Sequence, residues 1–150
     1  MVRLFLLTII ALIMSEQVIS QNLEDYQWKN RILLLVDSEP DSKALLSQLQ
    51  EFNSETRGLI ERDLIIFRVT PGTVYTSKGK PLEIDAPKIY NKYRLGSDFS
   101  GTLLIGKDGG SKLKKPFEVT TETIFSLIDG MPMRRAEMRQ NGKHWEIENQ

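Results

Sequence analysis

Two predominantly apolar runs, of which the first is continuous, are separated by one helical stretch and constrain the fold of this chain most strongly. The first run is 32–36 (ILLLV) and the second is 64–69 (LIIFRV). A strand without polar alternation is typical of burial on both faces, which requires helices on both sides of the sheet. The intervening residues carry one apolar stripe at helical spacing, formed by Leu45, Leu49, Phe52, Thr56 and Leu59. This order favours a right-handed parallel β-α-β unit.

The residues after the first run predict where the helix begins. Ser38 and Asp41 have the spacing of a capping box, and Pro40 suits a first helical turn. The helix is expected to end near Gly58, because glycine is common just beyond helix C-termini.

The second half of the chain predicts a helix, a hairpin and a closing helix. A polar stretch with two prolines and two glycines, 70–85, is expected to be a long loop, and such loops often bind ligands. After this loop the sequence predicts a helix over 86–95, a strand over 102–105, a turn over 107–110 and an edge strand over 111–115. A further helix is expected to be capped by Thr120 or Thr121 and to end at Gly130 and Pro132. A short basic helical piece over 133–139 and a polar tail over about 140–150 complete the chain.

This order of elements, β-α-β-α-β-β-α, predicts an α/β, thioredoxin-like three-layer sandwich with a mixed sheet, formed by one domain over residues 21–150. Redox-active thioredoxins carry a Cys-x-x-Cys pair between the first strand and the first helix. The chain has no cysteine, and residues 37–41 (DSEPD) stand at that place. A thiol-disulfide oxidoreductase or thiol peroxidase acting alone is therefore excluded.

The first twenty residues predict an export signal. Arg3 precedes an apolar run over 4–14, and a polar stretch then ends in Ser20, where we expect cleavage. Eleven apolar residues form a helix of about 16 Å, roughly half of the hydrocarbon thickness of a membrane. The prediction is therefore an exported protein, periplasmic or secreted, with no membrane span after cleavage.

Composition narrows the classes of function. Lysine and arginine number 20 and aspartate and glutamate number 20, which argues against a nucleic-acid binder because such proteins need a cationic surplus. The single histidine, His144, lies in the predicted tail and is not expected to act as a catalytic base. No cofactor and no metal site are expected: the acids Asp37, Glu39 and Asp41 are better explained as helix capping than as calcium ligands.

Four further stretches resemble a known family. They are 28–31 (WKNR), 61–64 (ERDL), 104–110 (LIGKDGG) and 128–135 (IDGMPMRR). They resemble the uncharacterised thioredoxin-like domain of unknown function that is found in small exported bacterial proteins and in sushi-repeat-containing extracellular matrix proteins of animals. The resemblance covers essentially all of the chain after the signal. It implies a cysteine-independent thioredoxin-like fold, a distant relationship to peroxiredoxins and no established catalytic residue.

The candidate binding residues are basic. They are Lys112, Lys114, Lys115, Arg134, Arg135 and Arg139. They form one face if the last helix returns beside the hairpin, and a positive face attracts acidic proteins or anionic polymers. The alternative is that these lysines protect a sheet edge and the arginines compensate a helix C-terminus. Trp28 and Tyr26 are expected to pack across the end of the sheet rather than to serve recognition.

Two functions remain open. The first is a redox-inactive binding module, expected to be monomeric, whose partner is another exported protein or an anionic polymer. The second is an enzyme of unknown type that uses carboxylate or arginine chemistry, for which Asp37, Asp108 and Arg31 are the candidate residues.

Overall fold

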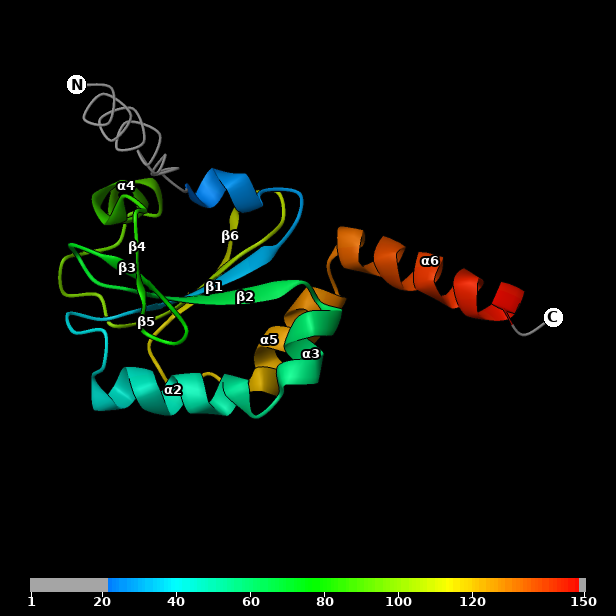
Figure 1. Ribbon diagram of the computed structural model, residues 1–150, viewed down its shortest axis with the longest axis horizontal. Helices are drawn as coiled ribbons and strands as arrows, with labels where there is room; N and C mark the ends of the chain where they lie inside the picture. Colours follow the sequence, from blue (N-terminus) through cyan, green and yellow to red (C-terminus); the bar gives the residue numbers. More distant parts are fainter. Residues whose placement is uncertain (1–21, 149–150) are drawn as a thin grey trace, which may run out of the picture.

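A six-stranded mixed sheet forms the centre of the protein (Figure 1). The computed structural model describes residues 22–148, so the predicted export signal and its cleavage site lie outside the described residues. The strand order is β4-β3-β2-β1-β5-β6. The elements, in chain order, are the 3-10 helix η1 (Leu23–Tyr26), β1 (Arg31–Val36), α2 (Lys43–Asn53), α3 (Thr56–Glu61), β2 (Leu64–Val69), β3 (Val74–Thr76), β4 (Pro81–Leu82), α4 (Ala86–Lys92), β5 (Gly101–Ile105), β6 (Ser111–Lys115), α5 (Thr121–Asp129) and α6 (Pro132–Glu148).

β1 is the central strand, and all six of its residues are buried. It pairs parallel with β2, where Leu33 lies opposite Ile66, and antiparallel with β5, where Leu33 lies opposite Leu104. The predicted parallel β-α-β unit and the hairpin that brings β6 to the edge are therefore confirmed.

Alternate residues of β1 face two separate cores. Ile32, Leu34 and Val36 pack beneath η1 and α4, whereas Leu33 and Leu35 pack beneath α2, α3 and α5. Full burial of one leucine contributes roughly 1.5–3 kcal/mol, so an unbroken apolar strand is stable only between two helical layers. This arrangement confirms the predicted three-layer sandwich.

The first helix begins later than predicted. Ser42, not Ser38, is its N-cap: the Ser42 hydroxyl accepts from the Leu45 amide at 3.2 Å and donates to Asp37 Oδ2 at 2.6 Å. The helix also breaks after Asn53, and a second helix, α3, contains Gly58 in its interior. Glycine is required there because an added Cβ would lie 2.5 Å from the Phe125 ring, not because it ends the helix.

Two more predictions are corrected. The expected loop over 70–85 contains the short hairpin of β3 and β4, which extends the sheet next to β2. The expected polar tail is helical, because α6 continues to Glu148 and projects away from the sheet (Figure 1). Gly142 costs a helix only about 1 kcal/mol, and no proline follows Pro132 to end it.

Candidate functional site

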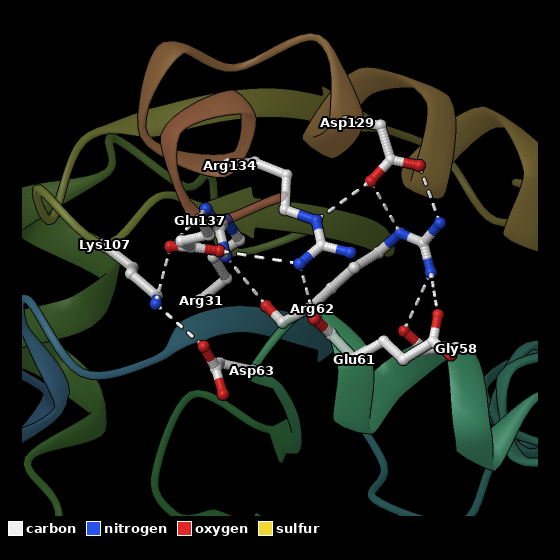
Figure 2. A network of polar contacts seen from close by, with 9 residues as sticks. All are labelled: Arg31, Gly58, Glu61, Arg62, Asp63, Lys107, Asp129, Arg134 and Glu137. Carbon is white, nitrogen blue, oxygen red and sulfur yellow. Dashed lines mark hydrogen bonds and ion pairs between the residues drawn. The ribbon is translucent and has the colours of Figure 1, made fainter. Parts of the chain in front are cut away.

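A network of charged side chains lies at the end of the sheet where β1 and β2 begin and β5 ends (Figure 2). Its members come from β1, the end of α3, the α3–β2 connection, the β5–β6 turn and helices α5 and α6. The charged members are Arg31, Glu61, Arg62, Asp63, Lys107, Asp129, Arg134 and Glu137. The four stretches that carry the family resemblance in the sequence thus meet in one place.

Arg31 is the centre of the network and is only 1% exposed. As the first residue of β1 it points its guanidinium along the end of the sheet (Figure 2). Nη1 donates to the Arg62 carbonyl at 2.9 Å, and Nη1 and Nη2 each donate to one carboxylate oxygen of Glu137 at 3.2 Å. Such a fork-to-carboxylate pair is directional and strong when it is buried.

Lys107 brings a second cation to the same carboxylate. Its ammonium group is 2.8 Å from Glu137 Oε1 and 2.8 Å from Asp63 Oδ2. The turn that carries it is held from two sides: the Gln27 amide donates to the Asp108 carbonyl, and the Tyr93 hydroxyl donates to the Gly109 carbonyl. Burial, with the nearby Glu24 and Asp108 carboxylates, raises the pKa of Tyr93 to about 12, so this hydroxyl stays a donor.

Arg62, Asp129 and Arg134 form the second half of the network. Arg62 donates to both Asp129 oxygens, at 3.0 and 2.6 Å, and its guanidinium lies 4.2 Å from the centre of the Phe125 ring. Arg134 donates to Asp129 Oδ1 at 3.2 Å and to the Glu61 carbonyl at 2.7 Å. These bonds join α5 and α6 to the α3–β2 connection.

The two acids at the centre titrate below their ordinary range. Burial raises the pKa of Asp129, but hydrogen bonds from Arg62 and Arg134 outweigh it and lower the pKa overall. Burial also raises the pKa of Glu137, but hydrogen bonds from Lys107 and Arg31 outweigh this effect and lower the pKa overall. Both acids are therefore charged at neutral pH. The cations of the network pair with carboxylates of the same chain, and among the described residues no group of three potential metal ligands occurs.

The six basic residues singled out from the sequence do not form one face. Arg134 is buried among Asp129, Glu137 and the Glu61 carbonyl, so its proposed place on an exposed patch is wrong. Its position one turn into α6 points it back toward α5 (Figure 2). Arg135 and Arg139 are exposed on α6, which projects outward from the body (Figure 1).

The lysines of β6 are exposed at the edge of the sheet, as predicted. Lys112 pairs with Asp108 at 2.6 Å, and Lys114 donates to the Arg94 carbonyl at 3.3 Å and lies 5.9 Å from the Phe99 ring centre. Lys115 has no ion-pair partner within the described part of the chain.

The three candidate catalytic residues lie apart. Arg31 and Asp37 flank opposite ends of β1, roughly 20 Å apart at 3.3 Å per residue. Asp37 accepts hydrogen bonds from the Ser38 amide at 2.7 Å and from Ser42, which caps α2. Asp108 is paired with Lys112, and this contact chiefly lowers its pKa. The segment that corresponds to the cysteine pair of a redox-active thioredoxin thus forms the N-terminal cap of α2 in this protein.

A groove of about 860 Å³ lies elsewhere, between α2 and residues 117–120. At its base the Gln48 amide bonds both backbone groups of Val119, at 2.6 and 2.8 Å. The groove contains none of the network residues.

The network was missed in the sequence although a signal for it exists. Arg31 is the first residue of β1, Asp63 directly precedes β2, and Lys107 follows β5 by two residues. Parallel strands begin at the same end of a sheet, and an antiparallel neighbour ends there. Flanking charges on these three strands are therefore expected to meet. Trp28, expected to pack across the sheet end, is instead 63% exposed beside them, whereas Tyr26 packs edge-on against Phe67 as expected.

Comparison with known proteins places the fold. A solved 2-Cys peroxiredoxin of Plasmodium vivax, in its reduced form, is similar with a TM-score of 0.53 at 13% identity, covering 77% of this chain and 84% of that chain. A thioredoxin-like protein of Bacteroides caccae has a TM-score of 0.46 at 16% identity, covering 71% of this chain and 42% of that one. At 13% identity the likeness to the peroxiredoxin shows the thioredoxin-like fold alone.

The sequence comparisons give the family. No curated protein matches the chain. In the described region no helix is both long and apolar enough to cross a membrane. The model of one domain of unknown function, DUF4174, matches residues 22–137, so it ends at Glu137, the acid that docks α6 on Arg31. The chain therefore belongs to the DUF4174 family, as a cysteine-free, thioredoxin-like member.

Proposed function

We propose that this protein is exported and works as a redox-independent binding module, which takes an acidic, extended segment of another exported protein along the free edge of β6. The observation that supports this most directly is the exposed five-residue edge strand with lysines at 112, 114 and 115. A partner strand that pairs with a sheet edge gains backbone hydrogen bonds, and its side chains set specificity.

The two edges of the sheet differ in a way that favours β6. The opposite edge strand, β4, has two residues, and one of them, Pro81, has no amide hydrogen to donate. β6 is longer and carries no proline before Pro116. Edge lysines disfavour pairing with a lysine-bearing or neutral strand from another copy, but they attract an acidic strand. The same charges therefore protect the sheet edge from self-association and select an acidic partner.

The catalytic alternative has less support, because Asp37, Asp108 and Arg31 are separated and each is held by its own partner. No single place in the described structure therefore joins these three groups for a reaction.

Binding of defined probes tests the proposal. We expect an acidic peptide in extended conformation to bind the wild type with salt-dependent affinity, and Lys114→Glu/Lys115→Glu to weaken it at least about 10-fold. Hydrogen exchange of the β6 amides should slow on binding, which a purely electrostatic contact would not produce.

The matched control is Lys78→Glu/Lys80→Glu, which makes the same change in charge on exposed lysines of the β3–β4 hairpin. It should bind the peptide like the wild type. Equal losses in both double variants, or unchanged β6 exchange, would reject strand addition. Preferential binding of a sulfated polysaccharide over the peptide would instead assign an anionic polymer as the partner.

A further inference from the structure

The Glu137 carboxylate occupies a site built from cations of other elements. Arg31 and Lys107 approach it at 3.2 and 2.8 Å, and Arg134 lies 3.7 Å from its second oxygen. Glu137 and Arg134 belong to α6, whereas Arg31 and Lys107 belong to the sheet and its turn. The helix therefore supplies the acid, and the body supplies the bases that receive it (Figure 2).

Each of the two receiving bases also has a partner outside α6. Arg31 is anchored by the Arg62 carbonyl at 2.9 Å, and Lys107 is anchored by Asp63 at 2.8 Å. The Nε of Arg31 is buried and has no hydrogen-bond partner among the described residues. The two receiving cations and Asp63 leave one net positive charge when Glu137 departs. A carboxylate is the group that matches the Arg31 fork in shape and charge.

The surrounding backbone is strained and presents an exposed aromatic ring. Trp28 has φ 66° and Asp63 has φ 48°, both in the left-handed region that disfavours residues with a Cβ. The Trp28 amide donates to the Lys107 carbonyl at 2.7 Å, so this exposed tryptophan stands beside the turn that carries Lys107. Strained residues of this kind cluster at ligand clamps.

We propose that Arg31 and Lys107 form a carboxylate-binding site that Glu137 fills in cis, and that an external carboxylate takes the same site when α6 moves away. α6 is suited to move, because its described attachment lies in its first two turns, at Arg134 and Glu137, and the rest projects outward (Figure 1). The site uses none of the lysines of β6, so this inference does not depend on the proposed function.

An intramolecular ligand competes at an effective concentration that reaches millimolar values, so free acids bind poorly while Glu137 is in place. Glu137→Ala removes the competitor and leaves the bases. We expect sodium acetate at neutral pH to raise the melting temperature of Glu137→Ala in a saturable way above sodium chloride of equal ionic strength. The wild type should need at least about 10-fold more acetate for the same response.

Controls separate the site from general salt effects. Glu122→Ala removes an exposed acid of α5 and should respond to acetate like the wild type. Arg31→Lys in the Glu137→Ala background removes the fork and should abolish saturation. A blocked Ala-Glu-Ala peptide, compared with Ala-Gln-Ala, tells whether an acidic side chain of another chain also enters or only small acids do.

Equal melting temperatures of Glu137→Ala in acetate and chloride would overturn the proposal, as would equal acetate responses of this variant and the wild type. If Glu137→Ala folds in acetate but not in chloride, the proposal is supported. If it folds in neither, Glu137→Gln decides, because it keeps the size of the side chain: an acetate-specific, saturable rise supports the site, and its absence rejects it.

Discussion

Gln48 shows at the scale of one residue how a polar side chain becomes structural. It lies on α2 and is 4% exposed, and its amide pairs with both the carbonyl and the N–H of Val119. The side chain thus takes the place of a backbone hydrogen-bonding partner and joins α2 to the segment before α5. Substitution Gln48→Leu leaves two buried backbone groups without partners. We expect a loss of about 2–4 kcal/mol in the free energy of unfolding, measured by urea denaturation.

Gln50→Leu on the same helix is the matched control. Gln50 is exposed, so the same chemical change should alter the free energy of unfolding by less than about 0.5 kcal/mol. Equal effects of the two substitutions would contradict the role of the Gln48 amide.

At the scale of one element, the start of α2 depends on a single hydroxyl. Ser42 accepts from the Leu45 amide and donates to Asp37, which also accepts from the Ser38 amide. Ser42→Ala should lower the free energy of unfolding by about 1 kcal/mol, because an N-cap serine satisfies a free helix amide. Ser38→Ala should leave the free energy of unfolding nearly unchanged. The comparison is made by thermal and urea denaturation, and a larger effect at Ser38 would restore the cap expected from the sequence.

At the scale of the whole molecule, the charge network ties two helices to the sheet and makes stability depend on pH. The pKa values of Asp129 and Glu137 are lower in the folded protein than their ordinary values of 3.8 and 4.5. A lowered pKa contributes stability above the unfolded value, and that contribution is lost as pH falls through the folded value. The wild type should therefore lose stability progressively as the pH falls below about 4.5.

The substitution Asp129→Asn separates the network from other acids. It should destabilise the protein at pH 7, where Arg62 and Arg134 lose their charged partner, and it should flatten the fall in stability below about pH 4. Glu122→Gln removes an exposed acid of the same helix outside the network and should retain the wild-type slope. Parallel pH profiles for Asp129→Asn and the wild type, from urea denaturation, would show that the network does not control acid stability.

Local patterns predicted the layers of this protein. The runs at 32–36 and 64–69 form buried or largely buried strands because a predominantly apolar strand needs cover on both faces. The apolar character of each run can be read from that segment alone. Thr120 caps α5 as expected, since the cap bond to Thr123 spans three residues. The short strands β3 and β4 were missed because they are stabilised by pairing, β3 with β2 and β4 with β3, rather than by a pattern of their own.

Residue types and spacings alone specified the sandwich, the edge strand and the absence of thiol chemistry, because these follow from composition and from contacts within a few residues. The burial of Arg31 and Arg134 and the identity of their partners depended on the folded chain, because these partners lie up to 106 residues away in sequence. An arginine on a surface and an arginine in a buried ion pair look alike in a sequence. Only the packing of α5 and α6 against the strand ends distinguishes them, by removing water and bringing the carboxylates within bonding distance.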